Sequence, residues 1–135
     1  MALIQWSEKY AVNIEEIDTQ HQKLVAILND LLDAMGRGQG KTVLDKTFNE
    51  LEAYTKTHFF AEEKLMIVYG YSDYNRHRSE HGKLINDLKN YKKDFETGKS
   101  KLTLEILDFL KNWLINHITL TDKEFGKYLT SKGLT

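Results

Sequence analysis

The sequence contains no cysteine and no proline among its 135 residues, and only eight glycines. The lack of cysteine excludes a disulfide scaffold, thiolate metal ligands and iron–sulfur clusters. The lack of proline removes the strongest helix breaker, and helix-forming Leu, Lys, Glu and Ala are plentiful, so the composition favours an all-helical chain. The glycines at Gly36–Gly40, Gly70 and Gly98 are expected to mark the turns between helices.

Neither charge sign is in excess, because 19 basic residues face 20 acidic ones and the formal net charge is −1. This balance argues against nucleic acid as a partner, since phosphate neutralisation needs a basic surface. No apolar run is long enough for membrane insertion, and residues Met1 to Trp6 lack the pattern of a secretory signal. We therefore expect a cytoplasmic protein with one domain over 1–135 and, without an obvious bare apolar patch, a monomer.

Four segments of helical length, at about 18–36, 42–69, 73–96 and 103–130, follow an apolar N-terminal arm at 1–17. Asp18 or Thr19 is expected to cap the first helix. In each segment apolar residues recur at spacings of three and four, which is typical of the inward-facing row of a helical bundle. Short connections make successive helices antiparallel. The sequence predicts an all-α fold, an antiparallel up-down-up-down four-helix bundle with the arm packed across it.

All five histidines lie on these inward-facing rows, together with two carboxylates, where a bundle normally places leucine. The seven residues are His21, His58, Glu62, His77, His81, His117 and Asp122. A buried polar group without a partner costs several kcal/mol, so something must satisfy the cluster. A hydrogen-bonded network would explain one lone histidine, whereas seven groups converging at one level from four helices favour a metal.

The step from His117 to Asp122 is five residues, which on a regular helix turns Asp122 about 140° away from the face of His117. Phe125 and Leu129 are nevertheless in register with Asp122. The pattern predicts one extra residue between them, absorbed as a π-bulge. The alternative is that Asp122 lies off the row as an ordinary surface carboxylate, which its agreement in phase with Phe125 and Leu129 disfavours.

Five imidazoles and two carboxylates are too many ligands for one octahedral ion. If each carboxylate bridges two metals, the protein supplies nine bonds, and an oxo or hydroxo bridge raises the total to eleven of the twelve positions in two octahedra. One position then stays open. We expect it to face an apolar pocket, which suits a small neutral diatomic ligand. The expected pocket residues are Leu24, Phe59, Trp113, Leu114 and Ile118.

The order and spacing of these residues resemble the bacterial hemerythrin family over essentially the whole chain. The motifs are a single histidine, H-x-x-x-E, H-x-x-x-H and H-x-x-x-x-D, at His21, His58–Glu62, His77–His81 and His117–Asp122. The resemblance implies a non-haem di-iron centre (Fe2+/Fe3+) bridged by Glu62, Asp122 and an oxo or hydroxo group. It assigns His77, His81 and His117 to one iron, and His21 and His58 to the other.

The resemblance further implies that O2 binds reversibly at the iron with two histidines, that small anions such as azide bind there too, and that the protein is no enzyme. Oxygen carriage, storage or delivery would follow. Glu63 and Glu80 are expected to point outward, so no general acid or base is predicted beside the site, and substitutions at both should be nearly silent. The alternatives are a di-iron enzyme acting on peroxide or nitric oxide or donating iron for repair, and a protein that senses O2, nitric oxide or redox state.

Overall fold

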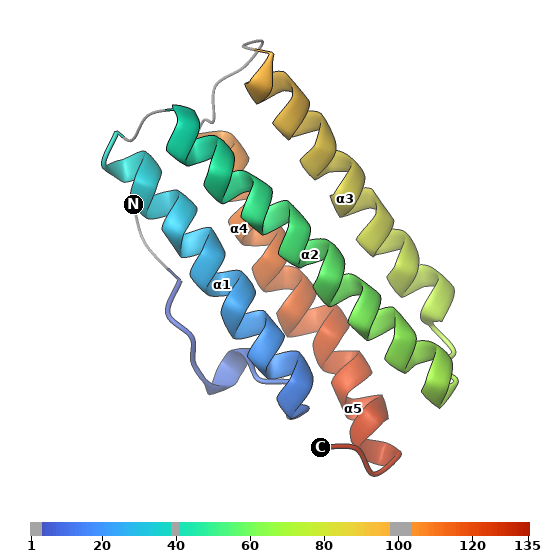
Figure 1. The fold of residues 1–135 in the computed structure, drawn as a ribbon. Helices are drawn as coiled ribbons and strands as arrows, with labels where there is room; N and C mark the ends of the chain where they lie inside the picture. Colours follow the sequence, from blue (N-terminus) through green and yellow to red (C-terminus); the bar gives the residue numbers. More distant parts are fainter. Residues whose placement is uncertain (1–3, 39–40, 98–103) are drawn as a thin grey trace.

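The computed structural model describes residues 4–38, 41–97 and 104–135, and every regular element within them is helical. The elements are η1 (Glu8–Tyr10), α1 (Glu15–Gly36), α2 (Lys41–Tyr69), α3 (Tyr74–Glu96), α4 (Leu104–Asn116), η2 (His117–Asp122) and α5 (Lys123–Ser131). The last three form one continuous rod. The start of α1, the end of α2, the start of α3 and α5 lie at the same end of the molecule (Figure 1). The fold is the predicted antiparallel four-helix bundle.

The first helix begins three residues earlier than predicted, and the prediction that Asp18 or Thr19 caps it was wrong. The N-cap position is Ile14, whose side chain makes no capping hydrogen bond. Asp18 lies inside the first turn. Its carboxylate accepts hydrogen bonds from the backbone N–H groups of Val12 at 2.8 Å and Asn13 at 3.1 Å. Asp18 thus fixes the chain that enters the helix, including the left-handed backbone of Asn13 (φ 67°).

The other helix boundaries lie close to the predicted ones. Helices α2 and α3 start within one residue of the predicted positions. Gly70 between them has a φ of 65°, a backbone conformation that residues with a side chain rarely adopt. Residues 39–40 of the turn predicted at Gly36–Gly40, and the whole turn predicted at Gly98, lie outside the described residues. No helix in the described part of the chain has both the length and the hydropathy that crossing a bilayer requires.

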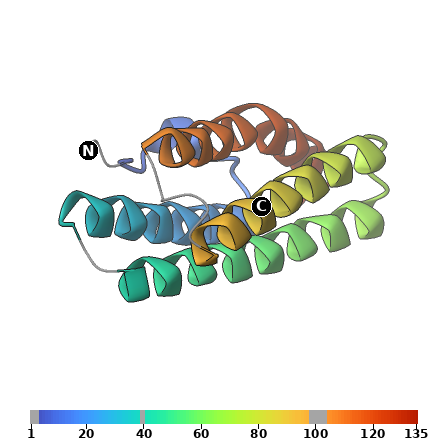
Figure 2. The same cartoon turned by 90° about the horizontal axis from the view of Figure 1, so that it is seen from above.

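The N-terminal arm packs on the bundle, as predicted. The backbone N–H of Ile4 donates to Asn29 Oδ1 and the Asn29 amide donates to the Ile4 carbonyl oxygen, both at 2.8 Å. Further along, Val12 is buried against Gly126 of α5. A Cβ atom at Gly126 would lie 2.6 Å from the Val12 carbonyl oxygen, so only glycine lets arm and helix approach this closely. In Figure 2 the arm runs beside the rod of α4, η2 and α5.

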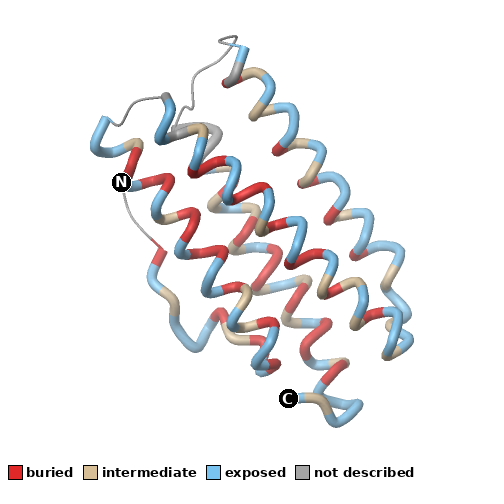
Figure 3. Tube along the Cα trace, viewed as in Figure 1, coloured by how far each residue is buried: buried red, intermediate tan, exposed pale blue. Residues whose placement is uncertain are grey.

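Buried residues follow the inward faces of the helices (Figure 3). The apolar ones among them form two clusters. The larger cluster fills most of the bundle and includes Leu24, Leu28, Leu31, Leu88, Leu110 and Leu114. The smaller cluster closes one end and consists of Val12, Ile14, Ile17, Met66, Phe125 and Leu129. On α1, α2 and the rod of α4, η2 and α5, the predicted polar residues fall between members of the two clusters. On α3 they fall between Tyr74, which packs against the smaller cluster, and Leu84 of the larger one. The bundle therefore holds one polar level between two apolar ones.

Candidate metal centre

The seven polar side chains predicted to converge do meet inside the bundle. Each is at most 4% exposed: His21, His58, Glu62, His77, His81, His117 and Asp122. Their ligand-type atoms form two groups, each close enough to surround one ion. One group has five members, Glu62, His77, His81, His117 and Asp122; the other has four, His21, His58, Glu62 and Asp122. Both carboxylates belong to both groups.

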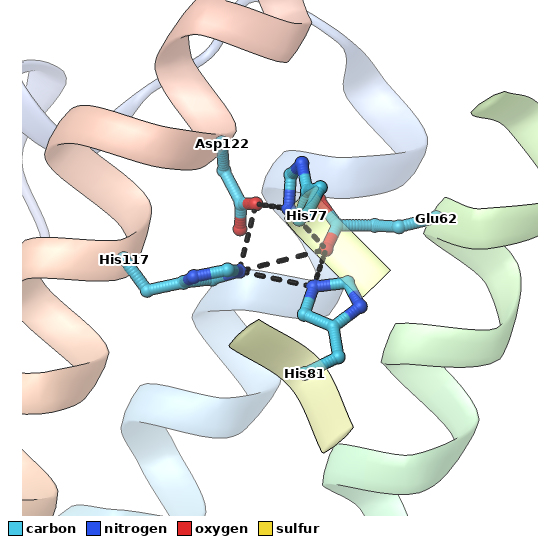
Figure 4. A group of neighbouring side chains, drawn as sticks. All are labelled: Glu62, His77, His81, His117 and Asp122. Atoms are coloured by element: carbon cyan, nitrogen blue, oxygen red, sulfur yellow. Dashed lines mark hydrogen bonds and ion pairs between the residues drawn. The ribbon is translucent and has the colours of Figure 1, made fainter. Parts of the chain in front are cut away.

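Three imidazoles of the larger group point at the two carboxylates (Figure 4). Asp122 Oδ1 lies 2.9 Å from His77 Nε2 and 3.0 Å from His117 Nε2. Glu62 Oε1 lies 3.2 Å from His81 Nε2. The Nε2 atoms of His81 and His117 are themselves 3.1 Å apart. All three histidines therefore present the same ring nitrogen to one point between α2, α3 and η2.

The smaller group completes the site from α1 and α2. His21 Nε2 lies 2.7 Å from Asp122 Oδ2, and His58 Nε2 lies 3.3 Å from Glu62 Oε1 and 3.9 Å from Asp122 Oδ2. Asp122 thus turns Oδ1 toward the larger group and Oδ2 toward the smaller one. That arrangement is the one required of a carboxylate that bridges two cations.

Asp122 faces the site because the chain is π-helical from His117 to Asp122, which confirms the predicted bulge. The N–H of Lys123 bonds to the carbonyl oxygen of Ile118, five residues back. The wider turn accommodates one extra residue, so His117 and Asp122 are both buried while Leu120 between them is 69% exposed. The alternative of a surface carboxylate at Asp122 is therefore wrong.

Several buried polar atoms at the site lack the hydrogen-bond partners that buried polar atoms normally have. Both Glu62 oxygens and His58 Nε2 are buried and accept or donate no hydrogen bond. His81 Nε2 and His117 Nε2 face each other at 3.1 Å, and only one of these two nitrogens can donate in the hydrogen bond between them. Unsatisfied buried groups are rare because they are costly. Imidazole nitrogen and carboxylate oxygen suit iron, zinc and manganese, and two cations would satisfy all of these atoms.

The electrostatics also favour positive charge at the site. Burial alone would lower the pKa of His58, but the carboxylates of Glu62 and Asp122 raise that pKa to about 9. The pKa of His117 is raised against burial in the same way, chiefly by Asp122. Burial and the neighbouring Asp122 would raise the pKa of Glu62, yet the imidazoles lower it well below its usual range. The carboxylates are therefore charged, and His58 and His117 hold protons where cations would otherwise bind.

A second layer of polar side chains contacts the outer nitrogens of the imidazoles, and the sequence prediction missed it. Glu63 Oε2 lies 3.1 Å from His81 Nδ1, and Glu80 Oε2 lies 3.5 Å from His117 Nδ1. The expectation that both carboxylates simply point outward was wrong, and the expectation of silent substitutions loses its basis. The pattern of inward-facing rows predicts which residues face the core. It does not predict which flanking residues contact the outer Nδ1 atoms of the histidines.

Gln20 belongs to the same layer, because its Oε1 lies 2.6 Å from His58 Nδ1. The sequence does contain a usable signal: metal-binding histidines commonly donate their second N–H to a nearby carboxylate or amide. Polar residues adjacent to a ligand, as Gln20 and Glu63 are, or one turn from it, are the candidates for this role.

A cavity of about 20 Å³ lies in the larger apolar cluster, enough for about one water-sized molecule. Its lining is Leu24, Leu28, Leu51, Thr55, Phe59, Leu84, Leu88, Leu110, Trp113 and Leu114. Four of the five predicted pocket residues are among them. Ile118 is not, although its side chain is fully buried. The Phe59 ring stacks on His81 at a centroid distance of 3.7 Å and Trp113 on His117 at 4.5 Å, so the cavity wall is also the wall of the site.

Residues 12–129 match the model of the hemerythrin HHE cation-binding domain, a range that contains all seven clustered residues. The chain is 31% identical over 132 residues to a bacteriohemerythrin of Methylococcus capsulatus, covering 97% of this chain and 100% of the relative. Identity to a bacteriohemerythrin of Pseudomonas aeruginosa is 33%, covering 90% and 78%. The crystal structure of a wild-type hemerythrin matches with a TM-score of 0.89 and 31% identity, covering 95% of this chain and 98% of that one.

Proposed function

The chain belongs to the hemerythrin family, and from this premise we propose that it binds O2 reversibly at a non-haem di-iron centre, for oxygen carriage, storage or delivery. The observation that supports the proposal is a pair of buried donor groups that share Glu62 and Asp122 next to an apolar cavity. A bundle without a metal would gain no stability from the unsatisfied Glu62 oxygens, because burying them without partners costs free energy.

In the proposed site His77, His81 and His117 hold one iron, and His21 and His58 hold the other. Glu62 and Asp122 would be shared by the two ions, together with an oxo or hydroxo group. When bound, each iron would supply one electron to O2 on binding and recover it on release, which makes the binding reversible. The group around His21 and His58 has four donors where the other has five, so the open position belongs to it.

The surroundings of the site support a carrier in preference to an enzyme. The described residues that line the cavity are apolar apart from Thr55, and none of them titrates. Glu63 and Glu80 contact the outer Nδ1 atoms, on the far side of the imidazoles from the bridging carboxylates. O2 on the cavity side would thus meet no titratable proton donor among the described residues that line the cavity, and protonation is the step that converts bound O2 into a reduced product.

The test is the absorption spectrum of the reduced protein under argon, after exposure to air, and after renewed removal of O2. We expect two irons per chain and an absorption band that appears with O2 and disappears without it. One metal per chain, zinc in protein expressed with ample iron, or a spectral change that O2 removal does not reverse would refute the proposal. Rapid turnover of hydrogen peroxide or nitric oxide would favour the di-iron enzyme instead.

A further inference from the structure

The larger group contains His77, His81 and His117 and is called the three-histidine group below; the smaller one contains His21 and His58 and is called the two-histidine group. The two groups differ in what the outer nitrogen atoms of their imidazoles contact. In the three-histidine group two carboxylates face the outer ring nitrogens: Glu63 accepts a hydrogen bond from His81 at 3.1 Å, and Glu80 Oε2 lies 3.5 Å from His117 Nδ1. Glu63 is also held by Arg78, whose Nε lies 3.6 Å from Glu63 Oε1. Both carboxylates are partly exposed, 23% for Glu63 and 37% for Glu80, so neither costs much desolvation.

Among the residues that the structure describes, no carboxylate contacts an outer imidazole nitrogen of the two-histidine group. His58 Nδ1 lies 2.6 Å from the amide oxygen of Gln20, which is neutral. His21 Nδ1 is buried and has no hydrogen-bond partner within the described residues, and the same holds for His77 Nδ1 of the three-histidine group. Two negative charges therefore stand behind the ligands of one position, and one amide stands behind those of the other.

This difference affects how strongly each position holds a cation. A carboxylate that accepts the Nδ1–H of an imidazole draws the proton toward itself, which increases the electron density on Nε2 and makes that nitrogen a better donor. The same hydrogen bond fixes the ring in the orientation that ligation requires, and the negative charge attracts the cation directly. Both effects add to the extra imidazole that the three-histidine group already has.

We propose that Glu63 and Glu80 are positioning residues that make the three-histidine position the tighter of the two, so that the first metal ion bound by the chain occupies it. Gln20 has the corresponding, weaker role at the position formed by His21 and His58. The inference rests on the proposed di-iron centre, because it requires two cation positions in one site. Loading is then ordered, with the open position filled last.

The test is an anaerobic titration of the metal-free protein with Co2+ alone. Binding is monitored by calorimetry and by the visible ligand-field bands of bound cobalt. Wild type should bind two ions in two resolved steps. Glu63→Gln and Glu80→Gln should each weaken the first step by about tenfold to a hundredfold and leave the second unchanged. Glu63→Ala should weaken the first step more than Glu63→Gln does, because glutamine keeps an acceptor that can orient the ring.

Two further variants complete the design. Gln20→Leu should weaken the second step alone. Glu50→Gln, which neutralises an exposed carboxylate on α2, should change neither step. Circular dichroism of each metal-free variant checks that the bundle is folded, and Glu80→Gln on α3 provides an independent measurement should Glu63→Gln on α2 not fold.

The outcomes separate the inference from the function on which it rests. Two ions bound by wild type with both steps unaltered in Glu63→Gln and Glu80→Gln, or with both steps weakened equally, would overturn the inference alone. A second step weakened in place of the first would overturn the proposed order of loading. Fewer than two ions bound by wild type would overturn the di-iron centre, and the inference with it.

Discussion

Among single residues Asp122 has the most demanding position, because its two carboxylate oxygens face different histidine groups. Asp122→Ala removes a donor from both groups at once. We expect the iron content to fall below two per chain and the O2-dependent absorption to disappear, measured by elemental analysis and spectroscopy. Glu124→Ala, on the exposed face two residues further on, is the matched control and should bind iron normally. Normal O2 binding by Asp122→Ala would show that the aspartate does not bridge.

The raised pKa of His58 predicts how the metal-free protein responds to pH. A pKa raised from its ordinary value of 6.5 to about 9 gives stability that is fully present below pH 6.5 and is lost as the pH rises through 9. We expect the urea midpoint of the metal-free protein to fall over this range. The fall should correspond to a loss on the order of 1 to 3 kcal/mol in the free energy of unfolding. A midpoint that rises between pH 6.5 and 9 would contradict the prediction.

The metal-loaded protein is the control for that measurement, and its pH dependence should have the opposite sign. Cations replace the imidazole protons, so metal binding releases protons and becomes tighter as the pH rises. At the acid end the metal-free protein should lose stability as well. The lowered pKa of Glu62 gives stability that is present above its ordinary value of 4.5 and is lost as the pH falls through the lowered value.

At the residue scale the sequence predicted which side chains converge but not how they are supported. Inward-facing rows on helices of alternating direction bring histidines such as His21 and His77 to one level, and the phase of Phe125 identified Asp122. Glu63 and Glu80 were mispredicted because both lie at the flank of a helix pair. Whether a flanking side chain reaches a ligand depends on helix rotation and on rotamers, which periodicity does not define.

At the scale of elements the contact between the arm and α5 depends on Gly126. Gly126→Ala would place a methyl group against the backbone of Val12, so the arm or α5 must shift. We expect a loss of about 1 to 3 kcal/mol in the free energy of unfolding, measured by urea denaturation. Gly82→Ala is the matched control, since its Cβ would meet nothing within 4 Å on the exposed face of α3. It should stabilise the protein by up to about 1 kcal/mol; equal effects of the two substitutions would refute the close approach.

Element boundaries were predictable where local chemistry sets them and not where distant contacts do. Gly70 marks its turn through a backbone conformation that belongs to the residue itself. The start of α1 depends on Asp18 binding back to Val12 and Asn13, and an aspartate near a helix start looks like an N-cap in sequence. The π segment was predictable because two rows, before and after it, disagree in phase by one residue.

At the scale of the whole molecule, helices from all four sides enclose the cavity next to the site. Leu114→Ala enlarges it at a cost of about 2–5 kcal/mol in packing. We expect a folded protein that still binds two irons but whose oxygenated spectrum decays faster in air, because water and protons reach the site more easily. Leu32→Ala, a buried substitution that does not line the cavity, is the control. Equal decay rates in both variants would show that the wall does not protect bound O2.

The π-helical segment also has a consequence for how this site is inherited. Loss or gain of one codon between Ile118 and Thr121 would turn everything after it by about 100° around the helix axis, taking Asp122 from the histidines and Phe125 from the core together. Substitution of Leu120 has no such effect, since this residue is 69% exposed and meets mainly solvent. In descendants of this gene we therefore expect the five-residue distance from His117 to Asp122 to persist while the exposed residue at position 120 drifts. Selection at this place acts on length before it acts on identity.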